Sequence, residues 1–216
     1  MKRLLILFCI PALMQTQKSF GQDSMSRLSV LISPALFVPV TVAAQGGIQY
    51  RLNNRWSVLA EAAFPVFYPT NTEYEKIQYW RTGLELKYRQ RTKDIATTYL
   101  SIQASYLFRE LADNQQGFYY TSTRTFSYSN AVIRSPVLSS AIKLGLEVSA
   151  GRRVFADVFL GAGLRFIFNK YKTESALVTS IQPKRHDLFT FDNAWIYNGT
   201  LMRLHATAGL RIGFRL

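Results

Sequence analysis

The C-terminal stretch, residues 200 to 216, constrains the fold more than any other part of the chain. Its even-numbered positions are apolar from Met202 to Leu216, whereas its odd-numbered positions include Arg203, His205, Arg211 and Arg215. A period of two residues is that of a β-strand, whose successive side chains point to opposite faces. Strands of soluble sheets usually have about five or six residues. A longer strand, apolar on one side and basic on the other, predicts the closing strand of an outer-membrane β-barrel.

Seven earlier segments alternate in the same way, which predicts eight strands in all. The segments are 26–34, 42–53, 55–68, 78–90, 95–109, 135–150, 153–169 and 200–216. Tight turns at 53–54, 91–94 and 151–152 alternate with longer loops at 35–41, 69–77, 110–134 and 170–199. Short periplasmic turns and longer extracellular loops are typical of outer-membrane barrels. The sequence therefore predicts an all-β fold, an eight-stranded antiparallel transmembrane β-barrel, in which loop 110–134 can form a hairpin outside the membrane.

The parity of the alternation is the same in nearly all of these segments: even positions are apolar or aromatic and odd positions are polar or glycine. We expect the even positions to face lipid and the odd positions to face the lumen. A soluble lipocalin-like barrel, apolar inside and polar outside, has the same alternation with the faces exchanged. The length of the strands and the aromatic residues near their ends, such as Trp56, Tyr88, Trp80 and Phe108, favour the membrane barrel.

The odd positions place both signs of charge in the predicted lumen. An eight-stranded barrel is just wide enough inside for side chains to fill, and charges buried there must pair or recruit water. We expect a salt-bridge core rather than an open pore; a narrow proton or ion path along the same charges is the alternative. The predicted network comprises Glu61, Arg81, Glu85, Lys87, Lys143, Glu147, Asp157, Arg165, Arg203, His205 and Arg211.

Much of the net charge of +13 lies at one predicted rim of the barrel. This periplasmic basic ring comprises Arg27, Arg51, Arg55, Arg89, Arg91, Lys93, Arg152, Arg153 and Arg215. Arginines at this level can reach phospholipid phosphates of the inner leaflet; the alternative is a docking ring for an acidic periplasmic partner. Nucleic acid is not expected as a partner, because an exported barrel is not in the same compartment.

Small residues gather on the predicted lipid-facing side of three strands. They are Ala44, Gly46, Ala60, Ala62, Ala206 and Ala208. Small residues let a second membrane protein approach closely, so they are a possible lateral interface; the alternative is that alanine is simply tolerated in lipid.

The first 21 residues resemble a secretory signal. Lys2 and Arg3 precede an apolar run from Leu4 to Met14, which is shorter than the roughly 20 residues of a membrane-spanning helix. We expect residues 1–21 to be a signal peptide and residues 22–216 to be the barrel. Cys9, the only cysteine, lies in the signal, so neither a disulfide nor thiol chemistry is expected in the mature protein.

The sequence offers little for catalysis. Ser101, Ser139 or Ser149 could be combined with Glu147 and His205 inside the lumen, but no spacing is diagnostic of a hydrolase. No cluster suggests a metal and no glycine-rich loop suggests a phosphate cofactor. Loop 170–199 has aromatic and basic residues suited to contact with protein, glycan or lipid phosphates, or to packing on itself. Residues 23–25, Asp-Ser-Met, resemble a short O-glycosylation sequon of the Bacteroidota, with Ser24 as acceptor.

Three stretches resemble a known group of barrels. They are Leu52-Asn-Asn-Arg-Trp-Ser-Val58 through Pro65, Gln78-Tyr-Trp-Arg-Thr-Gly-Leu-Glu-Leu-Lys-Tyr88, and 99–107. They are similar to small outer-membrane β-barrel proteins of Bacteroidota grouped as a domain of unknown function (DUF3575-like). The resemblance implies the architecture and the membrane but no activity.

These observations together predict a non-catalytic outer-membrane barrel without cofactor or metal. We expect it to act as a scaffold or accessory subunit of a larger outer-membrane complex, in contact with phospholipid, lipopolysaccharide and a protein partner. The alternatives are a free-standing structural or adhesion barrel, OmpX-like, and a lipid-modifying barrel enzyme.

Overall fold

The computed structural model describes residues 27–38, 41–67, 74–93, 95–113, 117–174, 177–180 and 196–216. The predicted signal peptide 1–21, Ser24 and the tip of loop 170–199 lie outside the described residues, as do the side chains of Arg91 and Lys93. Within the described ranges, no helix is long and apolar enough to cross a membrane.

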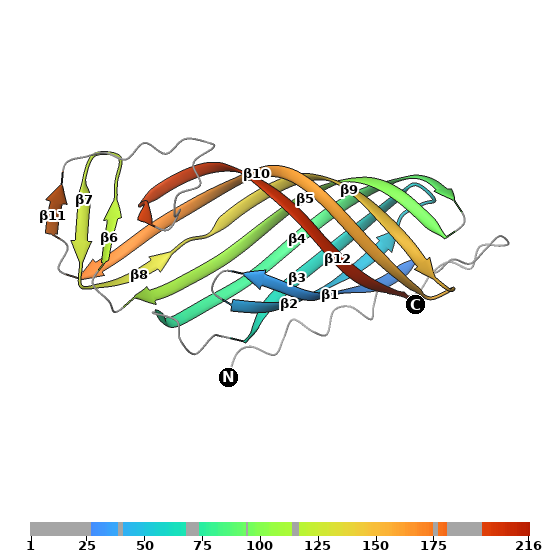
Figure 1. Cartoon of the computed structure of the whole chain (residues 1–216), viewed down its shortest axis with the longest axis horizontal. Helices are drawn as coiled ribbons and strands as arrows, with labels where there is room; N and C mark the ends of the chain where they lie inside the picture. Colours follow the sequence, from blue (N-terminus) through green and yellow to red (C-terminus); the bar gives the residue numbers. More distant parts are fainter. Residues whose placement is uncertain are drawn as a thin grey trace.

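Eight antiparallel strands form a closed barrel (Figure 1). They are β1 (Leu28–Val38), β2 (Thr41–Arg51), β3 (Trp56–Phe67), β4 (Tyr74–Lys93), β5 (Ala96–Asp113), β9 (Val137–Ala150), β10 (Val154–Glu174) and β12 (Gly199–Arg215). Each strand pairs with the next in this order, and β12 pairs with β1 to close the barrel. The predicted eight-stranded antiparallel barrel is thus confirmed, and each predicted segment overlaps one strand. The longer loop predicted at 35–41 is wrong, because β1 runs to Val38 and pairs with β2 as far as Thr41.

Strands β4, β5 and β10 are longer than predicted and extend beyond the shorter strands β1 to β3. Strand β8 (Asn130–Arg134) lies between β5 and β10 above β9, so β8 and β9 together form one wall strand that is interrupted at Ser135 and Pro136. Strands β6 (Gly117–Tyr120), β7 (Thr125–Tyr128) and β11 (Leu177–Ser180) form a separate three-stranded sheet. Loop 110–134 therefore contains the hairpin that its composition predicts.

The parity of the alternation is preserved around the barrel. Trp56 is opposite Tyr88, which is opposite Leu100, and the row continues through Leu144, Leu160 and Ala208. All six positions are even. On the barrel strands, even-numbered apolar residues are exposed or half-buried on the outer surface, while odd-numbered residues are buried or half-buried in the lumen.

Aromatic side chains mark both ends of the outer wall. The rings of Trp56 and Tyr88 lie 4.9 Å apart at the end where the tight turns lie, and Trp80 stacks on Phe108 at 5.7 Å nearer the other end. In the part of loop 110–134 above the barrel, the aromatic residues pack on themselves. Tyr119 stacks on Phe126 and on Tyr171, and this cluster also covers Leu111 and Ile133.

Candidate functional site

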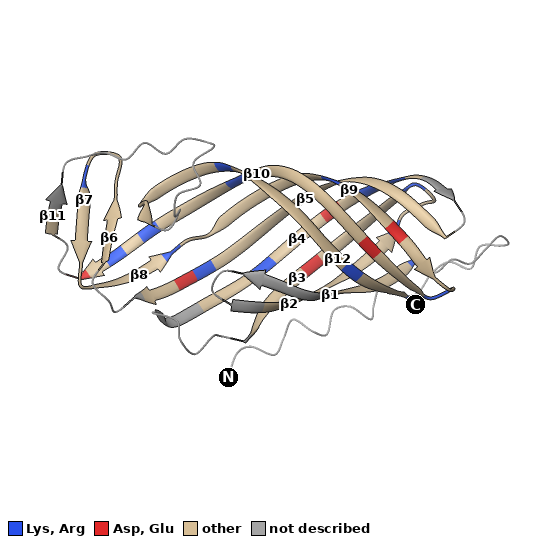
Figure 2. Cartoon of the chain, in the orientation of Figure 1, with Lys and Arg blue, Asp and Glu red and all other residues tan. Residues whose placement is uncertain are grey.

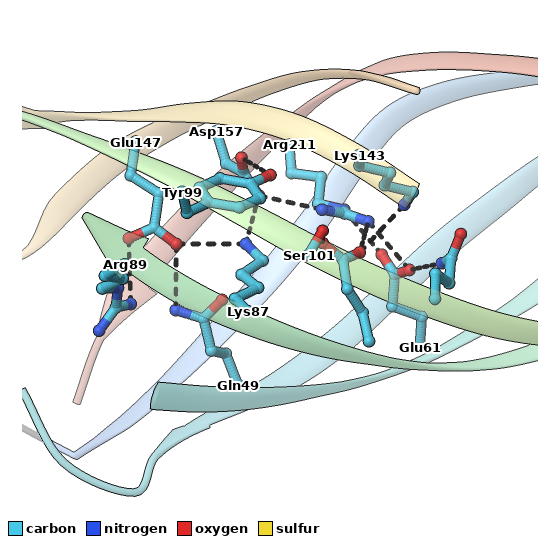
Figure 3. A network of polar contacts seen from close by, with 12 residues as sticks. Gln49, Glu61, Lys87, Arg89, Tyr99, Ser101, Lys143, Glu147, Asp157 and Arg211 are labelled. Atoms are coloured by element: carbon cyan, nitrogen blue, oxygen red, sulfur yellow. Dashed lines mark hydrogen bonds and ion pairs between the residues drawn. The ribbon is translucent and has the colours of Figure 1, made fainter. Parts of the chain in front are cut away.

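The lumen near the end with the tight turns is filled by a network of buried ion pairs (Figure 3). Arg211 of β12 is at its centre: its guanidinium lies 2.8 Å from a carboxylate oxygen of Glu61, 2.8 Å from one of Glu85 and 3.0 Å from one of Asp157. Its side chain is 1 % exposed. Four strands thus contribute to one group of charges, because β3, β4, β10 and β12 each direct an odd-numbered residue inward.

Three further bases complete the charge balance of this network. Lys87 Nζ lies 2.7 Å from Asp157 and 3.2 Å from Glu147, Lys143 Nζ lies 3.0 Å from Glu85, and Arg89 Nη2 lies 3.0 Å from Glu147. The four carboxylates Glu61, Glu85, Glu147 and Asp157 therefore face the four bases Lys87, Arg89, Lys143 and Arg211, and the charges cancel. Balanced pairing is what a lumen of low polarity requires.

Neutral side chains satisfy the remaining carboxylate oxygens. Tyr99 donates a hydrogen bond of 2.6 Å to Asp157, and Ser101 donates one of 2.7 Å to Glu85. The amides of Gln45 and Gln103 donate bonds of 2.7 Å and 3.0 Å to Glu61. These four residues are not part of the predicted network, although their odd positions already placed them in the lumen.

Among the ring residues whose side chains the structure describes, Arg89 turns inward instead of outward. Arg89 is 5 % exposed and belongs to the lumen network through Glu147. Its odd position in a strand turns it inward even though it lies near the rim. Arg27, Arg55, Arg152 and Arg153 are exposed, and Arg51 is half-buried. The guanidinium of Arg215 donates hydrogen bonds to Ser149 Oγ and to the Arg152 carbonyl oxygen.

Four predicted members of the lumen network lie farther along the barrel than the four carboxylates of these ion pairs. They are Arg81, Arg165, Arg203 and His205. Arg165 and Arg203 are directly opposite each other on β10 and β12. His205 lies within electrostatic range of Arg165 and Arg81. We call Arg81, Arg165, Arg203 and His205 the upper basic group.

Acidic and basic residues are distributed differently along the barrel (Figure 2). Acidic segments of the barrel strands gather mostly toward the end where the C-terminus lies, while basic segments occur along the whole length. Arg81 donates a hydrogen bond of 3.5 Å to Ser105 Oγ, which is 2.6 Å from Ser139 Oγ. Arg109, the last residue of the predicted strand 95–109, lies within electrostatic range of Arg165 and donates hydrogen bonds to Ser135.

The serines considered for catalysis have other partners. Ser101 donates to Glu85, Ser139 is bonded to Ser105, and Ser149 accepts from Arg215. Glu147 is held by Lys87 and Arg89. The structure does not bring any of these serines into a described hydrogen bond with His205, which lies opposite Gly163 of β10. No group of three metal-ligating side chains is present among the described residues.

A shallow apolar hollow of about 640 Å³ lies on the outer face of β1, β2 and β3. Four of the six predicted interface residues, Ala44, Gly46, Ala60 and Ala62, line it together with Ile32, Ile48 and Phe64. Ala206 and Ala208 are exposed on β12, where they do not line this hollow. A smaller hollow of about 280 Å³ follows the junction of β1 and β12, between Ile32, Val154 and Phe214.

Comparison with models of protein families, with curated proteins and with solved structures found no match for this chain. The structure itself shows the eight-stranded antiparallel barrel. Membership of the barrel family of Bacteroidota stays a prediction.

Proposed function

We propose that this chain is an outer-membrane β-barrel that acts, without catalysis, as a scaffold or accessory subunit of a larger complex, and that it is related to the small outer-membrane barrels of Bacteroidota. The observation that carries the proposal is the contrast between the two faces of one wall. Large apolar side chains are exposed on the outside of all eight barrel strands, while the buried ion pairs lie inside.

This contrast favours lipid over water as the outer solvent. A soluble barrel would expose a continuous apolar surface around its circumference, far beyond the few hundred Å² that soluble monomers usually tolerate. Strands of about 9 to 11 residues are long enough to cross a bilayer when tilted. The lengths of β1, β2 and β3, 11, 11 and 12 residues, match this requirement.

The filled lumen supports a role that depends on surfaces rather than on transport. Arg211, Lys87 and Lys143 occupy the centre of the barrel with their carboxylate partners. Movement of an ion along this path would break several buried ion pairs, each costly to separate. The surfaces that remain for function are the outer wall, the exposed basic ring and the three-stranded sheet above the barrel.

If the wall lies in a membrane, a charged residue on its outer face should destabilise the barrel more at the middle of the bilayer than near its surface. Leu160, 65 % exposed in the middle of β10, and Val154, 39 % exposed at its beginning, both face outward. We expect Leu160→Arg to lower the free energy of unfolding by about 2–4 kcal/mol in lipid vesicles, and Val154→Arg by about 0–1 kcal/mol. Urea titration of the two variants in vesicles measures both. Equal small losses would contradict a membrane-facing wall.

The hollow on β1 to β3 is our candidate for the lateral interface. We expect Ala60→Trp to fill it and to remove a partner that copurifies in mild detergent, because the bulky ring prevents close approach. Leu144→Trp, at an exposed position of β9 away from the hollow, is the matched control. Native gels of the tagged protein from outer membranes, with identification of the companions, measure the effect. Unchanged companions and native size in Ala60→Trp would contradict this interface.

The second candidate function is a free-standing structural or adhesion barrel. It is favoured by the three-stranded sheet, in which Phe118, Leu177 and Val178 are exposed. The same native gel separates the two candidates: a monomeric species that migrates faster unheated than boiled on a denaturing gel supports the free-standing barrel. A large species with stoichiometric companions supports the scaffold. The companions would also show whether the basic ring binds lipid phosphates alone or an acidic protein.

A further inference from the structure

Three pairs of arginines lie opposite each other on neighbouring strands at the end of the barrel with the tight turns. The pairs are Arg27 with Arg51, Arg55 with Arg89, and Arg153 with Arg215. In each pair the backbone N–H of the second residue donates a hydrogen bond to the carbonyl oxygen of the first. Opposite residues of an antiparallel ladder point to the same face of the sheet, and like charges in such a pair are destabilising. This end of the wall therefore carries a repeated unfavourable arrangement of charge.

The arginine pairs belong to the inner face of the wall. All six positions are odd, as are those of the lumen residues. Arg89 is 5 % exposed and contacts Glu147, and the guanidinium of Arg215 lies 5.0 Å from the ring centroid of Phe155, which is 1 % exposed. Arg51 lies within electrostatic range of Arg89, Arg215 and Glu147. The six residues therefore surround the mouth of the lumen, and we call them the mouth arginines.

The outer side of the wall is apolar at the same level. Residues next to the mouth arginines in sequence point outward and are exposed, among them Tyr50, Trp56, Val154 and Phe214. Lipid headgroups would meet this outer side, where aromatic side chains are typical of a membrane interface. The mouth arginines instead border the opening between the strands. Their position favours a ligand that approaches from beyond the turns over phospholipid phosphates.

The charge at the mouth is only partly balanced by the described residues. Three mouth arginines are exposed and form no ion pair within the described part of the chain: Arg27, Arg55 and Arg153. Deeper in the mouth, Arg89 Nη2 lies 3.0 Å from Glu147, while Arg89 Nε and Nη1 are buried without a hydrogen-bond partner. Glu147 is shared with Lys87, as Figure 3 shows. The mouth can therefore accept further carboxylates.

The distribution of the pairs around the rim indicates the kind of anion. They lie at the ends of β1 and β2, of β3 and β4, and of β10 and β12, which are six of the eight barrel strands. A single small anion cannot contact all three pairs, whereas an extended chain with several negative groups can. Above the mouth, the lumen is filled by Arg211 and its carboxylate partners. The ligand would therefore cover the mouth rather than enter the barrel.

From the three inward pairs and their exposed, unbalanced members, we propose that the mouth arginines bind an acidic segment of the partner protein. This segment is an extended peptide with several closely spaced aspartate or glutamate side chains. Guanidinium groups suit it because they bind carboxylates bidentately, and the bound carboxylates would offset the repulsion within each pair. The inference rests on the scaffold function proposed above and states the chemistry of the partner.

The test uses the full mature chain, folded in phosphatidylcholine nanodiscs, and a fluorescent peptide of ten glutamates, with a peptide of ten glutamines as the uncharged probe. Fluorescence anisotropy measures the Kd of each. We expect the wild type to bind the glutamate peptide at least about tenfold more tightly than the glutamine peptide. The variant Arg27→Gln/Arg55→Gln/Arg153→Gln should bind the glutamate peptide about tenfold more weakly than the wild type, because it loses three ion pairs together. These arginines are exposed, and faster migration of the unheated variant on a denaturing gel checks that it is folded.

Arg124→Gln/Lys170→Gln/Lys172→Gln is the matched control, because it removes the same charge from exposed positions at the opposite end of the molecule. It should leave the affinity for the glutamate peptide within about twofold of the wild type, since exposed charges far from the mouth are screened by salt. Arg27→Lys/Arg55→Lys/Arg153→Lys keeps the charge but not the bidentate geometry, and should retain part of the affinity.

Equal affinity of the wild type and the mouth variant for the glutamate peptide, or an equal loss in the mouth variant and the matched control, would overturn the proposal. So would a mouth variant that binds the peptide normally but loses a wild-type preference for phosphatidylglycerol over phosphatidylcholine, because the arginines would then serve lipid phosphates. Copurification tests the scaffold function separately. A wild type with companions but no peptide binding overturns this inference alone, whereas peptide binding by a barrel without companions supports the site and contradicts the scaffold.

Discussion

Replacement of Arg211 by methionine is expected to lower the free energy of unfolding by about 3–5 kcal/mol, the usual cost of removing one partner of a buried ion pair. Arg211 contacts Glu61, Glu85 and Asp157, and all three carboxylates are nearly fully buried. Methionine has a similar volume, so packing is largely kept and the loss reports on charge. Urea titration in lipid vesicles, followed by tryptophan fluorescence, measures the change.

Two further variants identify the cause of that loss. Arg134→Gln breaks the exposed ion pair with Glu110 and should cost at most about 1 kcal/mol, as exposed pairs do. Adding Glu85→Gln to Arg211→Met removes one of the uncompensated charges and should recover part of the stability. A loss below about 1 kcal/mol in Arg211→Met would show that water, rather than the arginine, balances these carboxylates.

The strands and their inward faces were predictable from the sequence because both depend on a local pattern. The period of two fixes the faces within each strand, and the turns keep the parity, as the row from Trp56 to Ala208 shows. The longer extent of β4, β5 and β10 was not predictable from the alternation of apolar and polar residues. Their ends lie beyond the shorter strands, where they pair with each other or with β8.

The pairing of charges inside the lumen was not predictable from parity. Parity places Arg81 and Arg89 on the same inner face of β4, but the tilt of the strands decides which of them meets Glu147. The predicted network therefore included Arg81 and left out Arg89. The sequence predicted that the last strand closes the barrel, but the alternation did not mark the register shift between Ser33 and Leu36, beyond which β1 pairs with β2 and not with β12.

Strands β9 and β10 approach closely at Gly163, so we expect a side chain at this position to destabilise the barrel strongly. A Cβ atom at this position would lie 1.8 Å from the Ser140 carbonyl oxygen and 2.7 Å from Ala141 Cα. Both are backbone atoms of β9, so no side-chain rotation relieves the overlap and the two strands must separate. We expect Gly163→Ala to lower the free energy of unfolding by about 3 kcal/mol, at the upper end of the cost of overpacking.

Gly83→Ala is the matched control, because Gly83 also faces the lumen from a barrel strand. A Cβ atom there would meet its nearest neighbour, Ser105 Cβ, at 3.4 Å, close to ordinary contact. We expect a change within about 1 kcal/mol, measured by the same urea titration in vesicles. Similar losses in both variants would mean that glycine is needed in this wall for a general reason, such as strand curvature. A large loss of stability confined to Gly163→Ala would instead show that β9 and β10 must approach closely at Gly163. Gly163 is two residues before Arg165, so this close approach also positions the Arg165 and Arg203 pair.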